Sequence, residues 1–273
     1  MKIITSANEL KKLLREQNKT IGYVPTMGAL HEGHLTLIRE ARKSNELVVV
    51  SIFVNPTQFL AGEDLEKYPR RDEADKKICE LAGVDILFMP NAKELYFDDE
   101  VKIVAPNVRG YVLEGATRPG HFSGVLRVVM KLLNIVSPTN AYFGKKDAQQ
   151  LNLIEQMVKH YFIDVNIVPV DTVRDSDGLA LSSRNVYLSK EERQEALKIP
   201  KALYMASNLI AKGELSVTKI EDAMLAVLSP LEIGYVAVVN RDFEPLREIE
   251  LGNTVILVEA IVGSTRLLDN IWL

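Results

Sequence analysis

Runs of apolar residues alternate with segments of helical periodicity over the first two-thirds of the 273-residue chain. Several runs stay apolar at successive positions, which is typical of parallel strands buried on both faces of a sheet. The runs predicted as strands are IGYVP (21–25), LVVVSIFV (47–54), VDILFMP (84–90), AYFG (141–144) and VNIVPV (165–170). Apolar residues at helical spacing predict helices over 34–45, 72–81, 123–136 and 148–161.

This strand–helix–strand order predicts an α/β fold, with a Rossmann-like, doubly wound parallel sheet over residues 1–174. The pattern changes beyond that point. A polar loop, RDSDGLALSSRN, leads into SKEE (189–192), whose S-x-x-E spacing is that of a capping box. A long helix, a second helix from about residue 217, and short strands at 235–240 and 254–262 predict a smaller α+β domain over 175–273.

Charge and cysteine content exclude several classes of protein. The formal net charge of −4 offers no basic excess for bulk nucleic-acid binding. The one cysteine, Cys79, rules out an intrachain disulfide framework and lies in a charged helical stretch, so we expect a packing residue. Charges interrupt MKIITSANELKKLLREQ before any apolar core of a secretory signal forms, and the longest apolar runs are too short to cross a bilayer. We therefore expect a cytoplasmic protein without membrane or nucleic-acid partners.

The stretch VPTMGALHEGHL (24–35) places two of the four histidines, His31 and His34, three residues apart after a predicted strand. A zinc site is one interpretation, but the H-E-x-x-H motif needs i,i+4 spacing and the chain has no cysteine pair to help. Two surface histidines at a helix start are another. The glycines, the strand end and the helix start favour a third, an anion site in which backbone N–H groups and imidazoles bind phosphate.

Two other loops add phosphate-binding chemistry. FGKKDAQQL (143–151) places Lys145, Lys146 and Asp147 after a predicted strand, and LSSRN (181–185) offers two hydroxyls and a guanidinium. Each is weak evidence alone, since a lysine pair is usually solvated. Together the three loops indicate a polyphosphate ligand, although neither G-x-x-x-x-G-K-[ST] nor G-x-G-x-x-G is present.

Amide side chains supply a different kind of contact. SIFVNPTQF (51–59) ends a strand with Asn55 and Gln58, and Gln150 lies one turn into a later helix. Amides both donate and accept hydrogen bonds, which suits a neutral polar substrate. Exposed amides without a role are the equally simple alternative for both glutamines.

Six segments in order resemble the pantothenate synthetase family, the pantoate–β-alanine ligases: PTMGALHEGHLTLI, SIFVNPTQF, YPR, RPGHFSGVLRVVMKLLNIVSP, AYFGKKDAQQL and TVRDSDGLALSSRN. HEGH resembles that family's version of the HxGH signature of nucleotidyltransferases. The resemblance implies ATP-dependent condensation of (R)-pantoate with β-alanine to give pantothenate. The pantoate carboxylate would attack the α-phosphate of ATP and release pyrophosphate, and the amine would then attack the pantoyl-adenylate and release AMP. The family is typically homodimeric, so we expect a homodimer.

Transferred position by position, the resemblance implies roles for individual residues. His34 would be a proton donor, His31 would contact phosphate beside it, and Lys146 would reach the phosphates. Contacts with ATP would come from Met27, Gly28, Ala29, Leu30, His31, Glu32, Gly33, His34, Gly144, Lys145, Lys146, Asp147, Val173, Leu181, Ser182, Ser183 and Arg184. Gln58 and Gln150 would bind pantoate, Gln58 also near β-alanine, with Asn55 and Arg118 as further polar contacts. Mg²⁺ would be carried by the ATP phosphates rather than by a protein metal site.

Two positions depart from the family pattern, and two other functions stay open at this point. Lys145 stands where the family commonly has Glu or Gln, and Asp171 stands where a proline is usual. A nucleotidylyltransferase that keeps the nucleotide on its product, or an ATP-binding sensor without catalysis, would share much of this sequence pattern. We also expect the second domain to close over the nucleotide and exclude water from the acyl-adenylate.

Overall fold

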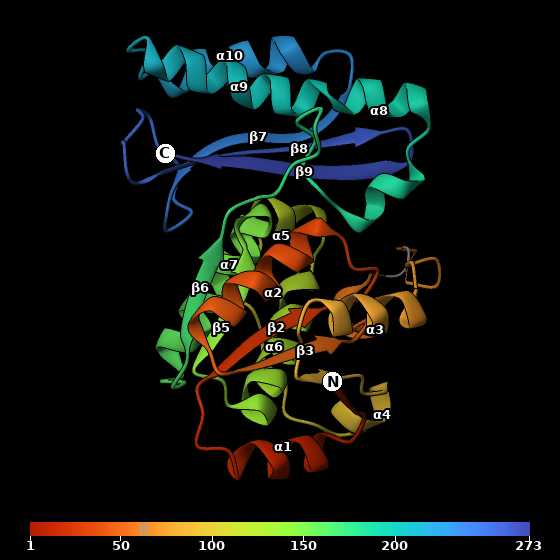
Figure 1. Cartoon of the computed structure of the whole chain (residues 1–273). Coiled ribbons are helices and arrows are strands. Elements are labelled where there is room, and N and C mark those ends of the chain that lie inside the picture. The colour runs from red at the N-terminus through yellow and green to blue at the C-terminus, as the bar shows by residue number, and fades with distance from the viewer. Residues whose placement is uncertain (61, 64) are drawn as a thin grey trace. The chain divides into compact units, whose positions relative to one another are not determined.

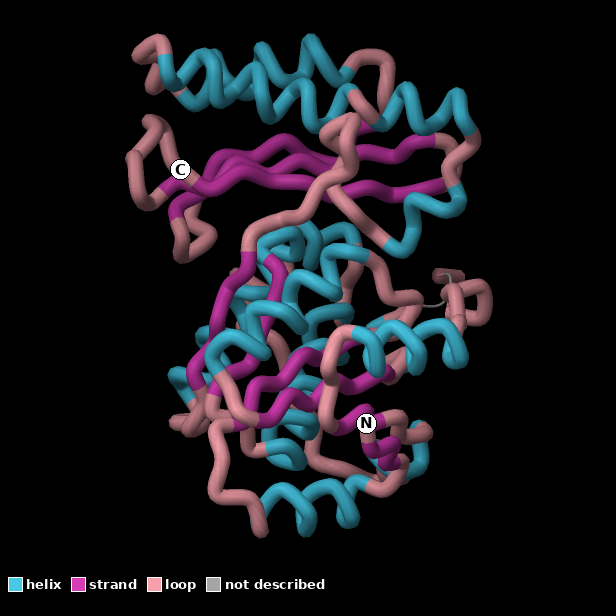
Figure 2. The backbone as a smooth tube through the Cα atoms, viewed as in Figure 1, coloured by secondary structure: helices cyan, strands magenta, loops and turns pink. Residues whose placement is uncertain are grey.

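The computed structural model describes residues 1–60, 62–63 and 65–273. It divides into two compact units (Figures 1 and 2). The first comprises Met1–Lys145 and Leu153–Asp171, and the second comprises Lys146–Asn152 and Thr172–Leu273. Each unit has a sheet of its own.

The first unit is built on a six-stranded parallel sheet in the order β1-β4-β3-β2-β5-β6. This arrangement confirms the predicted α/β class with a parallel sheet. Every residue of the central strand β3 is buried, as its apolar run, interrupted only by Ser51, predicts. The short edge strand β1 was not among the predicted runs. The strands are β1 Lys2–Ile4, β2 Ile21–Thr26, β3 Leu47–Ile52, β4 Ile86–Phe88, β5 Asn140–Gly144 and β6 Asn166–Val170.

Helices flank this sheet. Those of the first unit are α1 Ala7–Arg15, α2 Glu32–Ser44, α3 Asp72–Leu81, α4 Ala92–Leu95, α5 Glu114–Thr117, α6 His121–Val136 and α7 Ala148–His160, the first residues of α7 grouping with the second unit. Ile38 of α2 and Cys79 of α3 share a core cluster with strand residues such as Val24. Burial, aided by the charge of Asp75, raises the pKa of the Cys79 thiol to about 12. Cys79 is therefore a packing residue, as predicted.

The order in which the chain adds strands reverses beside β2: β3 and β4 lie on one side of it, and β5 and β6 lie on the other. Tyr23 of β2 pairs with Val49 of β3 on one side and with Ala141 of β5 on the other. In open parallel sheets, ligands bind at the carboxyl ends of the strands beside such a switch point. The loops that follow Thr26 and Gly144 leave the sheet at this place, and both carry predicted phosphate-binding residues.

The second unit pairs a three-stranded antiparallel sheet with helices. Ser189 and Glu192 form the predicted capping box before α8, with reciprocal bonds of 2.7 and 3.1 Å. The long helix expected after this box is two helices instead. Pro200 lies in the first turn of the second one, where a missing N–H is tolerated, which explains the break. The elements are α8 Lys190–Ala196, α9 Lys198–Ala211, α10 Val217–Leu228, β7 Glu232–Asn240, β8 Thr254–Val262 and β9 Thr265–Trp272, the last of them not predicted.

Across the described residues, every helix is too short or too polar to traverse a lipid bilayer.

Candidate active site

The loop between β2 and α2 makes a sharp turn in left-handed backbone. Gly28 has φ of 84° and Ala29 has φ of 50°. Glycine adopts this conformation without strain, whereas an L-residue such as Ala29 costs about 1–2 kcal/mol there. The loop must therefore be stabilised by contacts from outside it.

Asp75, in the first turn of α3, supplies those contacts. Its Oδ2 accepts from the N–H of Ala29 at 2.7 Å and its Oδ1 from the N–H of Leu30 at 2.8 Å. The residue is 1% exposed. Charge-assisted bonds of this kind are shorter and stronger than neutral ones, and the start of α3 favours the negative charge. Thr26 Oγ1 accepts from the N–H of Gly28 at 3.2 Å on the other side of the turn.

His31 and His34 cap the start of α2 reciprocally. The Nδ1 of His31 accepts from the N–H of Gly33 at 3.2 Å, and the Nδ1 of His34 accepts from the N–H of His31 at 3.2 Å. The ring centroids are 4.1 Å apart. A backbone N–H can only donate, so each Nδ1 must be unprotonated and each neutral ring carries its hydrogen on Nε2. A Cβ on Gly33 would lie 2.9 Å from the His31 ring, so the absence of a side chain at Gly33 leaves room for the ring.

Most of the backbone amides expected to bind an anion here are bound within the protein. Five amides of the loop already donate to acceptors of the protein itself: those of Gly28, Ala29, Leu30, His31 and Gly33. The sequence suggests backbone N–H groups at a helix start as the phosphate donors. In the structure these five amides bind acceptors within the protein and hold the loop together.

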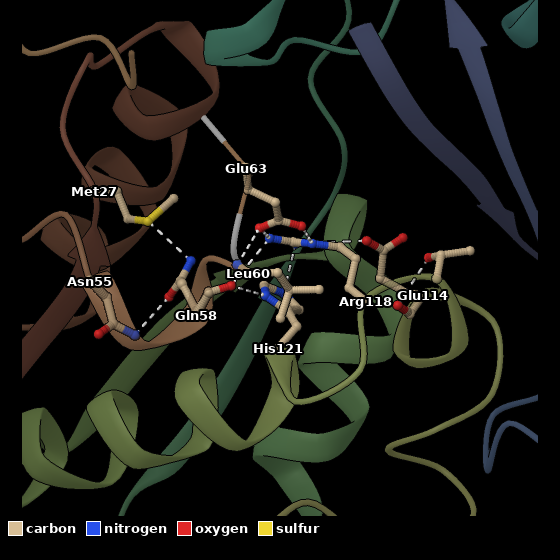
Figure 3. Close-up of polar contacts among 9 residues, drawn as sticks. Met27, Asn55, Gln58, Leu60, Glu63, Glu114, Arg118 and His121 are labelled. Carbon is tan, nitrogen blue, oxygen red and sulfur yellow. Dashed lines mark hydrogen bonds and ion pairs between the residues drawn. The ribbon is translucent and has the colours of Figure 1, made fainter. Parts of the chain in front are cut away.

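Gln58 lies at the centre of a second polar cluster (Figure 3). It ends the 3₁₀ helix η1, Pro56–Gln58, which follows β3. Its Oε1 accepts from Asn55 Nδ2 at 3.0 Å, and its Nε2 donates to the sulfur of Met27 at 3.1 Å. Gln58, which is predicted to bind substrate, thus contacts Met27, the first residue of the loop between β2 and α2 (residues 27–31). We call this segment the histidine loop.

Asn55 is oriented entirely by the protein around it. It is 1% exposed. Its Oδ1 accepts from Tyr96 Oη at 2.6 Å and from Thr57 N–H at 3.2 Å, while its Nδ2 also donates to the carbonyl of Gly124 at 3.2 Å. Every hydrogen-bonding group of this side chain has a protein partner, which makes Asn55 a residue that orients Gln58.

The backbone of Gln58 is held by Arg118 and His121 (Figure 3). The carbonyl of Gln58 accepts from His121 Nδ1–H at 2.8 Å and from Arg118 Nη2 at 3.2 Å. Arg118 Nη1 donates to His121 Nε2 at 3.1 Å. Burial, and next the charge of Arg118, lower the pKa of His121 to about 4, so the ring is neutral. Its hydrogen lies on Nδ1, the reverse of His31 and His34.

Arg118, predicted to contact substrate, forms an ion pair within the unit. Its Nε and Nη2 donate to the two carboxylate oxygens of Glu63 at 2.7 and 2.6 Å. Glu114 Oε1 lies 3.8 Å from Nη1. Although burial raises the pKa of Glu63, the hydrogen bonds from Arg118 and Leu60 hold it below its ordinary value.

The lysine pair after β5 divides between the two units. In the first, Lys145 Nζ lies 2.6 Å from Asp171 Oδ1, an exposed ion pair between the two positions that depart from the family pattern. In the second, Lys146 Nζ lies 3.6 Å from Asp147 Oδ1, and Asn270 Nδ2 donates to the Lys146 carbonyl at 2.7 Å. Gln150 is half-buried in the first turn of α7.

The LSSRN segment is folded as a short 3₁₀ helix, η3 Ser183–Tyr187, in the second unit. Ser182 caps it by accepting from the N–H of Arg184 at 3.3 Å. Leu181 N–H donates to the carbonyl of Val173 at 3.0 Å, which closes the loop on itself. The predicted ATP-binding residues Leu181 to Arg184 thus lie in one half-buried segment whose backbone is fixed by hydrogen bonds.

Sequence reasoning missed three positioning residues, Asp75, Tyr96 and His121.

Among the residues that the structure describes, no group of three or more His, Cys, Asp or Glu side chains is arranged to hold a metal ion.

Known proteins of one family resemble the chain over its whole length. The family model for pantoate-beta-alanine ligase matches residues 2–272. Pantothenate synthetase of Sulfurimonas denitrificans is 62% identical over 273 residues, covering all of both chains. The crystal structure of pantothenate synthetase from Thermus thermophilus superposes with a TM-score of 0.95 at 40% identity, covering 99% of each chain. Pantoate-beta-alanine ligase from Francisella tularensis, solved with beta-gamma ATP and beta-alanine, gives 0.82 at 36% identity and covers 100% of this chain and 97% of that one.

Proposed function

Because the chain belongs to the pantoate-beta-alanine ligase family, we propose that it condenses (R)-pantoate with β-alanine at the expense of ATP through a pantoyl-adenylate. The observation that carries the proposal is the placement of two different chemistries side by side. A histidine pair with Nε2–H donors follows β2, and an amide fixed by Asn55 contacts the same loop through Met27. The first suits phosphate and the second suits a small polar acid.

Formation of the adenylate needs charge stabilisation more than a covalent nucleophile. The pantoate carboxylate would attack the α-phosphorus of ATP while pyrophosphate leaves. His34 Nε2–H and His31 Nε2–H would donate to phosphate oxygens and stabilise the charge that develops on the leaving group. Lys146 would bind the same phosphates as a point charge. Residues 27–34, 144–147, 173 and 181–184 are the proposed ATP contacts.

The glutamines would bind pantoate. Gln58 enters the site with its amide already oriented by Asn55 and its carbonyl held by His121. Gln150 would supply the second amide. In the second step the amine of β-alanine, once neutral, would attack the acyl carbon, and AMP would leave with the bond electrons. Asn55 and Arg118 contribute to pantoate binding through Gln58.

Mg²⁺ would enter as part of the Mg–ATP substrate. Mg²⁺ retains phosphate and water oxygens as ligands and needs few protein ligands at such a site. The cationic and N–H donors of the candidate loops suit the phosphates rather than the ion, so residue roles in this proposal concern the phosphate oxygens only.

The proposal extends to organisation. Residues 1–174 would bind nucleotide and pantoate, and residues 175–273 would form a lid domain. The enzyme would act as a cytoplasmic homodimer, in keeping with its family.

An assay for AMP tests the function directly. ATP, Mg²⁺ and pantoate are supplied with and without β-alanine, to wild type and to His34→Ala. We expect AMP only with both substrates and a rate roughly a hundredfold or more lower in the variant, as loss of a charge-stabilising donor requires.

His34→Asn is the matched control, since its amide oxygen can take the place of Nδ1 in the cap and offers nothing at Nε2. The same loss in both variants would assign the effect to Nε2–H. Absence of AMP from wild type under every combination would overturn the proposal.

A further inference from the structure

Asp75 is a buried carboxylate to which the reaction scheme assigns no role. It is 1% exposed, whereas its neighbours Asp72 and Glu73 in the first turn of α3 are exposed. Acidic residues are common at helix starts because they favour the helix dipole, and an exposed position is enough for that effect. A buried carboxylate needs specific partners to offset its loss of hydration.

Those partners are consecutive amides of the histidine loop. Ala29 N–H and Leu30 N–H donate to the two different oxygens of Asp75 at 2.7 and 2.8 Å. Successive N–H groups that converge on one place form a concave binding site for an anion. Here a side chain from α3, 45 residues along the chain from Leu30, fills that site.

We call the two hydrogen bonds from Ala29 and Leu30 to Asp75 the clamp. The clamp lies directly before the reciprocal cap that His31 and His34 form at the start of α2. Ala29 is held in left-handed backbone with φ of 50°, and Leu30 precedes His31, whose own N–H donates to His34. A change in the direction of the Ala29 and Leu30 amides would therefore move the His31 amide. That amide fixes the tautomer of His34.

We propose that Asp75 is a positioning residue for catalysis, which acts by occupying the amide site of Ala29 and Leu30. It has two effects. It holds both imidazoles with hydrogen on Nε2, and it withholds these two amides from the triphosphate, so that phosphate is bound by the rings. This inference rests on the proposed function of His31 and His34.

The variant that tests it is Asp75→Asn, with Asp72→Asn as the matched control on the same helix turn. Asparagine keeps the shape but presents one oxygen and one NH₂ group, and the NH₂ faces an amide donor. Pyrophosphate–ATP exchange in the presence of pantoate should fall roughly tenfold to a hundredfold in Asp75→Asn, with the KM for β-alanine within about twofold of wild type. Asp72→Asn should match wild type.

A second readout does not depend on turnover. Long-range ¹⁵N–¹H spectra distinguish histidine tautomers, and the chain has only four histidines, so His121 and His160 serve as internal references. We expect the ring nitrogens of His31 and His34 to report fixed Nε2–H tautomers in wild type and averaged tautomers in Asp75→Asn. Exchange that falls while these signals stay at wild-type positions would overturn the positioning role, as would wild-type exchange.

A third measurement uses wild type alone. Misfolding of Asp75→Asn therefore cannot be mistaken for loss of the clamp. Scalar coupling across a hydrogen bond should join the Asp75 carboxyl carbon to the amide nitrogens of Ala29 and Leu30. Its absence would overturn the clamp. Failure of AMP formation in wild type with both couplings present would instead overturn the proposed function and leave the clamp intact.

Discussion

Two groups of histidines in the first unit carry their hydrogens on opposite nitrogens. In His31 and His34 the Nδ1 atoms face backbone N–H groups, so they accept and the hydrogens lie on Nε2. In His121 the Nδ1 faces the carbonyl of Gln58, so it donates, and Nε2 accepts from Arg118. The same side chain thus accepts through Nδ1 in one region and donates through it in the other. The backbone group opposite Nδ1 determines which ring nitrogen carries the hydrogen.

The two regions should respond differently to acid. The folded-state pKa of His121 is about 4, below its ordinary value of 6.5, because of burial and the Arg118 charge. The unfolded chain therefore takes up a proton before the folded one. The stability that His121 contributes is fully present above pH 6.5 and is lost as the pH falls to 4, by about 3 kcal/mol at most.

Denaturant unfolding between pH 7.5 and 4 measures this loss. His121→Asn keeps a donor at the position of Nδ1 and cannot titrate, so its stability should fall less steeply than that of wild type. His160→Asn, changed at an exposed histidine, should follow wild type. If the free energy of unfolding fell equally steeply with pH in wild type and in His121→Asn, protonation of His121 would not be the cause of the loss.

Two glycines, Gly124 and Gly33, lie against these two regions. A Cβ on Gly124 of α6 would lie 2.1 Å from the carbonyl oxygen of Thr57, so Gly124→Ala must push the helix away from η1. We expect a loss of about 1–3 kcal/mol in the free energy of unfolding, as for overpacked cores, and a higher KM for pantoate. A Cβ on Gly33 would meet the ring of His31 instead, which can move. Gly33→Ala should thus lower kcat with little loss of stability. Equal losses of stability would contradict the distinction.

The smallest effect concerns the support behind Asn55. Tyr96→Phe removes the Oη donor of the 2.6 Å bond to Asn55 Oδ1 and leaves the Thr57 N–H in place. We expect about 1 kcal/mol less stability and a modestly raised KM for pantoate, with kcat for bound substrates unchanged. Tyr204→Phe, at an exposed tyrosine, is the control. A fall in kcat without a change in KM would show instead that Tyr96 acts on His31 and His34 rather than on Gln58.

How far the sequence predicts this molecule depends on the range of the contact. The strands from β2 to β6 and the box at Ser189 follow from local periodicity and capping, and each was recognised from its own residues. The short strand β1 is only three residues long, which leaves too little periodicity to detect. Strand β9 includes the polar residues Arg266, Asp269 and Asn270 and therefore shows no apolar run.

The candidate site was predictable where its residues form a motif. His31, His34 and Gln58 follow strand ends in recognisable order. Asp75 was not, because an acidic residue in the first turn of a helix already has a sufficient local explanation. Its burial depends on the approach of a loop 45 residues away. His121 was not predictable either: Arg118 lies three residues away, but the carbonyl that His121 binds belongs to Gln58, 63 residues away.

If Gln58 binds pantoate as proposed, its contact with Met27 has a consequence for substrate discrimination. A thioether is a weak, polarizable acceptor. The Gln58 Nε2–H bound to it in the structure can exchange this acceptor for a carboxylate or hydroxyl oxygen with a net gain. A ligand without an oxygen at that place gains nothing from the exchange. In the proposed role of Gln58, the thioether would keep the amide oriented until pantoate binds, and binding would be selective for molecules whose oxygen is a better acceptor than sulfur.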